Sequence, residues 1–269
     1  MRGLINRNAV VTGAASGIGA AIAKRFCEEG VNVLALDRNK VAWADDYENA
    51  DSLQLDLTKD SAPDSVLENI DSFLKGSCDI LVNAAGVSAM APFEQTDSEV
   101  WDTTLAINFE AVTTLTRKLL PFLKKSDQAR IIMIGSICSE FAPSGMSAYV
   151  VSKHAVLGLT RALASEFGTD GITVNCIQPG AIVTGITAAA FEGDISFREH
   201  WESKAAIGRL GLPDDVAPLA AFLVSEEGRF ISGHGIYVEI DLCSVFINFT
   251  CFGVLENLYD ILFFPKIVS

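Results

Sequence analysis

The first 37 residues alternate between apolar runs and a helical pattern, and this alternation limits the folds open to the chain. A short apolar run at 8–12 stops at Gly13. From Gly17 to Gly30 apolar residues recur at helical spacing, and residues 31–37 (VNVLALD) again have the composition of a strand. The segment therefore predicts a strand, a glycine-rich turn, a helix and a second strand.

The same alternation continues along the chain. Further strands are predicted at 53–57, 79–86, 130–136 and 172–180, and helices at 61–75, 98–124, 149–168 and 213–225. Apolar strands that alternate with helices indicate a doubly wound parallel sheet covered on both faces, a three-layer α/β/α sandwich. There is no low-complexity linker and no internal repeat, so we expect a single domain over residues 1–240.

The last stretch, residues 241–269, differs from the rest as an atypical apolar C-terminal tail. Residues 242–255 carry no charge, but fourteen residues are too few to cross a bilayer, which takes about 20. The main interpretation is a buried or interface segment. Interfacial membrane contact and a non-native end or altered reading frame are the alternatives.

The net charge of the chain limits which partners it is expected to bind. The chain has 34 acidic and 20 basic residues, a formal net charge of −14, which disfavours nucleic acid and anionic membranes as partners. None of the six cysteines and three histidines has the spacing of a zinc site, so no metal is expected. Free thiols and an N-terminus with no apolar signal core lead us to expect a reducing, cytoplasmic location.

The glycine-rich turn, residues 12–19 (TGAASGIG), suits a dinucleotide. Gly13 allows a tight turn, Gly17 allows backbone to approach a pyrophosphate, and Gly19 allows the helix and strand to pack closely. The helix that follows presents free N–H groups and a partial positive charge to phosphates. The alternative is a purely structural turn.

The end of the second predicted strand favours NAD over NADP. A carboxylate at Asp37 accepts hydrogen bonds from the adenine-ribose hydroxyls and repels a 2′-phosphate. Ser16 adds no positive charge for such a phosphate. Arg38 is the counter-evidence, since its side chain could turn toward one.

Tyr149 and Lys153 lie four positions apart and so share one helix face. Ser136 ends a predicted strand, at the edge of the sheet where ligands of such folds bind. A phenol has a pKa of about 10, and a neighbouring ammonium lowers it. Tyr149 could then exchange a proton with an alcohol or carbonyl while Ser136 holds the substrate oxygen. The alternative is an accidental pair on an amphipathic helix.

Together these motifs resemble those of the single-domain short-chain dehydrogenase/reductase family, over roughly residues 5–240. TGAASGIG resembles its TGxxxGxG motif, and NAAG (83–86) its NNAG motif. Ser136, Tyr149 and Lys153 follow its Ser–x12–Tyr–x3–Lys pattern, Asn108 matches its helix asparagine, and PGAIVT (179–184) its nicotinamide segment. The resemblance implies a Rossmann-type fold and an NAD-dependent oxidoreductase acting on a secondary alcohol or ketone.

The resemblance also implies roles for further residues. Asn108 would order a water that connects Lys153 to solvent, and Lys153 would also bind the nicotinamide ribose. Asp56 would contact the adenine edge, whereas Ile182 and Thr184 would hold the carboxamide. The implied cofactor-binding set also includes Gly13, Ser16, Gly17, Ile18, Gly19, Asp37, Leu57, Asn83, Ala84, Gly86, Tyr149, Pro179 and Gly180. Asn83 and Asn108 could instead be buried amides that only satisfy backbone groups.

Residues 185–209 fall where the family carries its substrate lid. The flank 137–148 has no Arg or Lys to anchor a carboxylate, which hints at a neutral or partly apolar small-molecule alcohol or ketone. Arg198 or Lys204 would overturn this hint if the lid folds inward. The family implies a homo-oligomer, a dimer or tetramer, although residues after 238 depart from its pattern. A silent NAD-sensing protein and an oligomeric scaffold are the competing functions.

Overall fold

The sheet has seven parallel strands in the order β3-β2-β1-β4-β5-β6-β7. The computed structural model describes residues 1–238 of the chain. The strands are β1 (Asn8–Thr12), β2 (Asn32–Asp37), β3 (Ala50–Gln54), β4 (Ile80–Asn83), β5 (Arg130–Ile134), β6 (Thr173–Pro179) and β7 (Gly235–Val238). The predicted doubly wound, single-domain α/β fold is confirmed.

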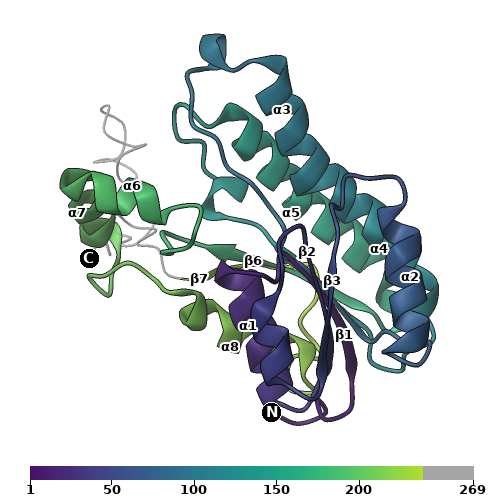
Figure 1. The fold of residues 1–269 in the computed structure, drawn as a ribbon. Coiled ribbons are helices and arrows are strands. Elements are labelled where there is room, and N and C mark those ends of the chain that lie inside the picture. The colour runs from purple at the N-terminus through teal and green to yellow at the C-terminus, as the bar shows by residue number, and fades with distance from the viewer. Residues whose placement is uncertain (239–269) are drawn as a thin grey trace, which may run out of the picture.

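Helices cover both faces of this sheet (Figure 1). On one face lie α1 (Gly17–Glu28) and α8 (Pro213–Val224), which pack against each other. On the other lie α2 (Ala62–Ser72), α4 (Ala111–Leu123) and α5 (Ser147–Phe167), with α3 (Ser98–Leu105) against α5. Each face has its own apolar core, one containing Phe26 and Ile22, the other Leu115 and Leu119.

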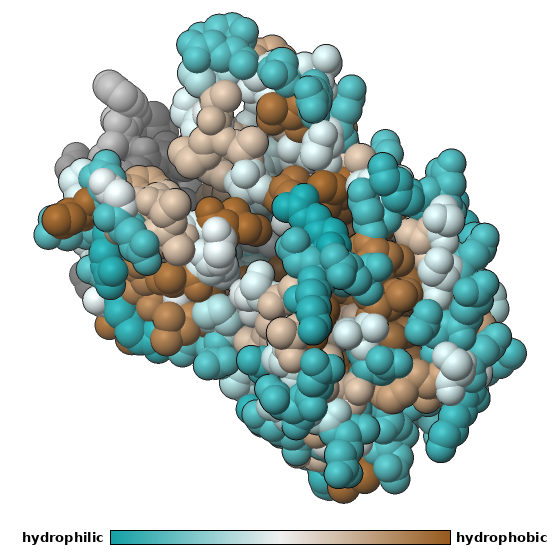
Figure 2. Space-filling view, viewed as in Figure 1, coloured by the Kyte–Doolittle hydropathy of each residue, from teal (hydrophilic) through white to brown (hydrophobic). Residues whose placement is uncertain are grey.

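Two short helices, α6 (Ala188–Gly193) and α7 (Ile195–Lys204), project to one side of the sheet (Figure 1). They form most of the predicted lid segment 185–209. Figure 2 shows apolar surface over this projection and between it and the helical layer above the sheet. Ile186 and Ile195 are among the exposed apolar side chains there.

The sequence prediction misplaced one strand. The run 53–57 was expected to be a strand, but β3 ends at Gln54, so Asp56 and Leu57 lie beyond it. Leu55 and Leu57 are apolar because they pack against the core that contains Leu115, not because they pair in the sheet. Similarly, the predicted helix 98–124 contains a π-helical segment at Ala106–Glu110 between α3 and α4.

The remaining expectations from the sequence concern either residues 1–238, which the structure describes, or the residues after them. Cys27, Cys78, Cys138 and Cys176 are free and buried, as predicted. No helix within residues 1–238 has the length and apolar character needed to cross a membrane. The predicted interface role of 242–255 lies outside the described residues.

The site is placed by the strand order. Because β1 and β4 are neighbours, the chain crosses from them to opposite sides of the sheet, which opens a crevice at their carboxyl ends. Thr12 Oγ1 spans this point: it accepts hydrogen bonds from the backbone N–H groups of Ala84 and Ala85, both at 3.0 Å. The ends of the two strands are thereby held together under any ligand bound there.

Candidate active site

The glycine-rich turn links β1, α1 and the segment after β4 at close range. Gly13 has φ +67°, and a Cβ on it would lie 2.8 Å from the backbone of Ala85. A Cβ on Gly19 would lie 2.2 Å from the carbonyl oxygen of Gly13. Both positions therefore require glycine for the close packing that the sequence predicted.

The start of α1 leaves room for phosphates. Gly17 has φ +58°, and a Cβ there would come within 3.4 Å of the Thr184 side chain, which shows that the turn faces the segment after β6. Ser16 is the N-cap residue, but its exposed side chain makes no capping hydrogen bond, and Ile18 follows in the first turn. These groups fit a pyrophosphate, whose charge the helix N-terminus favours.

Asp37 lies beside this turn at the end of β2. Its Oδ2 accepts a hydrogen bond from the Ala15 N–H at 3.0 Å, and its Oδ1 accepts one from the Asn39 N–H at 2.8 Å. Trp43 Nε1 donates to the carbonyl oxygen of Ala14 at 2.7 Å, which fixes the same turn from the other side. The carboxylate is thus held at a set position next to the phosphate cradle.

Lys153 is buried at the carboxyl end of β5. Its side chain extends from α5, is 5% exposed, and donates from Nζ to the carbonyl oxygen of Ile134 at 2.7 Å. The same Nζ lies 5.6 Å from the ring centroid of Tyr149 and 3.6 Å from where a Cβ on Gly86 would be. Burial is the main cause that lowers the pKa of Lys153 to about 8.

Ser136 and Tyr149 face each other near this amine. Ser136 Oγ accepts a hydrogen bond from the Cys138 N–H at 3.1 Å, which holds the hydroxyl at the end of the strand. Burial raises the pKa of the Tyr149 phenol to about 12, while a hydrogen bond with Ser136 acts in the opposite direction. The expectation that Lys153 lowers this pKa is wrong for the side chains alone, because burial is the larger effect.

The chain is similar to known proteins over most of its length. A family model described as enoyl-(acyl carrier protein) reductase matches residues 13–240. The 3-oxoacyl-(acyl-carrier-protein) reductase FabG of Vibrio cholerae is 33% identical over 236 residues, covering 86% of this chain and 95% of that protein. Dehydrogenase/reductase SDR family member 4 of Oryctolagus cuniculus is 32% identical, covering 87% of this chain and 93% of its own length.

Solved structures are similar over the same range. A protein described as an NAD(P)-dependent gluconate 5-dehydrogenase from Beutenbergia cavernae, with NADP bound at low occupancy, is 35% identical with a TM-score of 0.82. The alignment covers 87% of this chain and 96% of that one. The aldohexose dehydrogenase of Thermoplasma acidophilum is 29% identical with a TM-score of 0.81, over 87% of this chain and 93% of its own.

The chain belongs to the short-chain dehydrogenase/reductase family. As a short-chain dehydrogenase/reductase it is an oxidoreductase that acts on CH–OH groups with a nicotinamide cofactor. The glycine cradle, the uncapped start of α1 and the fixed carboxylate of Asp37 are the features of this chain that fit such a dinucleotide.

Two buried asparagines of this short-chain dehydrogenase/reductase have structural partners. Asn83 Nδ2 donates to Thr116 Oγ1 at 3.2 Å, so its side chain points into the core and not toward the crevice. The predicted contact at 83 would therefore fall to the backbone, which continues through Ala84 and Gly86. Asn108, in the π-helical segment, accepts from the N–H of Val87 at 2.8 Å and donates to its carbonyl at 2.9 Å.

The water link between Asn108 and Lys153 stays a prediction. A Cβ on Gly86 would be 3.3 Å from Asn108 Oδ1 and 3.6 Å from Lys153 Nζ, so both groups border the same residue. Asn108 Nδ2 also donates to Ser152 Oγ at 3.0 Å, which fastens the π-helical segment to α5. The asparagine thus holds the loop after β4 against the helix that carries Tyr149.

The predicted cofactor contacts at the two ends of the crevice differ in burial: Asp56 is exposed, whereas Ile182 is buried. Asp56 is exposed, and its carboxylate is occupied by the N–H and hydroxyl of Thr58, which lower its pKa. After β6, Pro179 and Gly180 lead to buried Ile182, whose carbonyl accepts from Thr187 Oγ1 at 2.6 Å. Thr187 Oγ1 also accepts from the N–H of Thr184 at 2.9 Å.

The lid has an aromatic interior. The rings of Phe191 and Phe197 stack with centroids 5.5 Å apart, and Trp201 meets Phe197 edge-on at 6.2 Å. Arg198 pairs with Glu202 at 2.8 Å, on the same helix. The three aromatic side chains of the lid therefore form one cluster.

Thr12 and Thr187 are site-shaping residues that the sequence reasoning missed. Thr12 joins β1 to the segment after β4, and Thr187 holds the loop that carries Thr184. The position of Thr12 at a strand end, directly before the turn glycine, was a usable indication. Nothing in the sequence marks Thr187, because its partners Ile182 and Thr184 are defined only by the fold of the loop.

Proposed function

We propose that this protein interconverts a secondary alcohol and its ketone with NAD, using Ser136, Tyr149 and Lys153 as the proton-transfer group. The observation that carries the proposal is the placement of the buried Lys153 amine beside Tyr149 and Gly86, at the carboxyl edge next to the glycine cradle. The nicotinamide, when bound, supplies or accepts the hydride. The remaining steps belong to the side chains of the protein.

Tyr149 is the group we assign to proton exchange with the substrate oxygen. With a pKa of about 12 the phenol is protonated at neutral pH, so it begins as a proton donor in the direction of carbonyl reduction. Ser136, fixed by the Cys138 N–H, donates a second hydrogen bond to the substrate oxygen as charge develops on it. Lys153, with a pKa of about 8, can return a proton to Tyr149 near physiological pH.

The cofactor preference is proposed from Asp37. Its carboxylate is fixed beside the turn by the Ala15 N–H, so it cannot move away from a 2′-phosphate without losing that bond. The Beutenbergia relative has NADP bound, and Arg38 follows Asp37 here. The fixed charge supports NAD, and we expect kcat/KM to be at least about tenfold higher with NAD than with NADP.

The substrate is proposed to be neutral or partly apolar near the reacting carbon. The flank 137–148 contains no Arg or Lys, and its one carboxylate, Glu140, is taken up by Tyr237 at 2.6 Å and Arg161 at 3.4 Å. Of the two lid cations that could anchor an acid, Arg198 and Lys204, Arg198 is paired with Glu202. The cytoplasmic location, the homo-oligomer and the domain limit at 240 remain predictions.

The decisive experiment is Tyr149→Phe, assayed on a panel of secondary alcohols with NAD and NADP. We expect kcat to fall by about 10²–10⁴-fold, because the variant lacks the exchangeable proton, while the Kd for NAD measured by fluorescence stays the same. The matched control is Tyr47→Phe, a tyrosine packed beside Trp43, away from Lys153. Unchanged turnover in Tyr149→Phe would remove the assignment, and NAD binding without turnover in the wild type would favour a sensing protein.

A further inference from the structure

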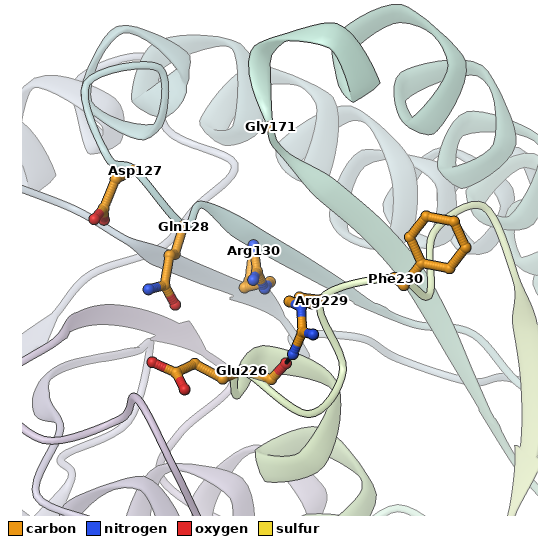
Figure 3. A pocket seen from close by; sticks show the side chains of 7 residues that line it. All are labelled: Asp127, Gln128, Arg130, Gly171, Glu226, Arg229 and Phe230. Atoms are coloured by element: carbon orange, nitrogen blue, oxygen red, sulfur yellow. Dashed lines mark hydrogen bonds between the residues drawn. The ribbon is translucent and has the colours of Figure 1, made fainter.

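A second pocket lies at the opposite edge of the sheet, where β5 begins (Figure 3). Its volume is about 460 Å³, and it lies between the start of β5, the turn before β6 and the segment after α8. The side chains and backbone that line it are those of Asp127, Gln128, Arg130, Gly171, Glu226, Arg229 and Phe230. None of these residues belongs to the candidate active site.

Arg130 is a buried cation without a counterion in this pocket. Its side chain is 3% exposed, and within residues 1–238 its guanidinium makes one hydrogen bond, from Nη1 to the carbonyl oxygen of Ala129 at 2.9 Å. Nε is buried with no partner, and no described carboxylate lies within 4.0 Å of the group. Burial lowers the pKa of Arg130 to about 10, so it is still charged at neutral pH.

The neighbouring acids offset the charge of Arg130 only in part: Asp127 raises the pKa of Arg130, but burial and Arg7 lower it more. Figure 3 shows the carboxylates of Asp127 and Glu226 directed away from it. Glu226 reaches toward Gly3, where a Cβ would lie 2.9 Å from its Oε1. The carboxylate of Asp79 forms a salt bridge with Arg7, with its Oδ2 3.6 Å from the Arg7 Nε.

Two further cations add to the positive charge at this place. Arg7 lies close enough to Arg130 to lower the pKa of Arg130 further. Arg229 lines the same pocket, and its Nη1 donates to the carbonyl oxygen of Glu226 at 3.1 Å. Within residues 1–238, neither Arg130 nor Arg229 forms a salt bridge. Unpaired guanidinium groups that converge on one cavity repel each other unless an anion lies between them.

We propose that this pocket binds a small oxyanion, a carboxylate or a phosphate, between Arg130 and Arg229. Guanidinium N–H groups match the oxygens of either anion, and the cavity limits the ligand to a small one. The bound anion would join the starts of β5 and β6 to the segment that follows α8. Its effect would be on the stability of the fold.

The test is the melting temperature of the full chain, titrated with phosphate or succinate against sodium chloride of equal ionic strength. At about ten times Kd, the anion should raise the Tm of the wild type by about 3 °C, and above Kd the Tm should rise with the logarithm of the anion concentration. A general salt effect on burial would instead grow in proportion to the concentration. The phosphate and succinate arms decide which oxyanion the pocket prefers.

Three variants identify the place of binding. Arg130→Met and Arg229→Gln should lose this logarithmic rise in Tm, whereas Arg117→Met, which removes an exposed arginine from α4, should keep it. Phosphate that binds instead at the glycine-rich turn would stabilise all four proteins equally, and that result would overturn the proposal. A wild type whose Tm rises with neither anion beyond the effect of sodium chloride, or only in proportion to the concentration, would overturn it as well. Arg229→Gln changes an exposed residue, so the test does not depend on whether Arg130→Met folds.

Discussion

The two ends of β5 each hold a buried cation, and they hold it in similar ways. At the carboxyl end, Lys153 donates to the carbonyl oxygen of Ile134, the last residue of the strand. At the amino end, Arg130 donates to the carbonyl oxygen of Ala129, just before the strand begins. Neither has a carboxylate partner within the described residues, and both are at most 5% exposed.

The two cations differ in whether they can lose a proton near neutral pH. Burial lowers the pKa of Lys153 to about 8, so this amine can release its proton close to physiological pH. Burial lowers the pKa of Arg130 only to about 10, so the guanidinium stays charged. A buried lysine without a counterion therefore suits proton transfer, whereas a buried arginine without one suits the binding of an anion.

The largest expected effect is on kcat, which should depend on the cation at the carboxyl end of β5 and not on the cation at its amino end. The same substitution, to methionine, is made at both positions. Lys153→Met should lower kcat by about 10²–10⁴-fold because Tyr149 loses the amine that restores its proton. Arg130→Met should keep kcat within about threefold, because its side chain does not reach the reacting atoms. Steady-state kcat with NAD measures both, and an equal loss in the two variants would erase the distinction.

Stability should change in the same direction at both ends. Replacing an unpaired buried charge by an apolar side chain of similar length removes the cost of keeping that charge out of water. We expect each methionine variant to have a free energy of unfolding about 1–3 kcal/mol higher than the wild type at pH 7. Urea unfolding without cofactor or oxyanions measures it. Loss of stability in either variant would mean that its packing depends on the cation.

The positions that the sequence could indicate are those fixed by local geometry. Gly13, Gly17 and Gly19 could be predicted because a turn between a strand and a helix has few backbone solutions. Tyr149 and Lys153 could be placed on one face because four residues make about one helical turn. The parallel, doubly wound sheet followed from the alternation of strands and helices, whereas the order of its strands was not predicted.

What the sequence could not show depends on packing between distant segments. The direction of the Asn83 side chain depends on the register of β4 against β5, which sends it to Thr116. The pKa of Tyr149 depends on how deeply α5 is buried, which its own sequence does not state. The pocket at Arg130 is lined by residues from 127 to 230, which only the fold brings together. The sequence shows an arginine at the start of a strand, but it does not show that this arginine has no acidic partner.

The smallest expected effect is a pH dependence that only one end of β5 shows. Lys153 has a folded pKa of about 8, below its ordinary value of 10.5. Between these values the unfolded chain binds more protons than the folded one, so the stability of the wild type gains with rising pH from this group. The cost of the buried ammonium is fully present below about pH 8 and is relieved above it.

The advantage of Lys153→Met over the wild type should therefore shrink by about 1 kcal/mol between pH 8 and 9. The advantage of Arg130→Met should stay constant over that range, because Arg130 titrates only near pH 10. Burial raises the pKa of Cys176 to about 11 and that of Cys78 to about 12, so both thiols stay protonated in the folded chain up to pH 9. Lys153 lowers the pKa of Cys176, so Lys153→Met only raises that pKa further and leaves the thiol protonated over this range. The contributions of both thiols therefore cancel in the differences, which urea unfolding at the two pH values gives directly. A constant advantage for Lys153→Met would mean that the amine keeps its ordinary pKa, and the proton-transfer role of Lys153 would lose its physical basis.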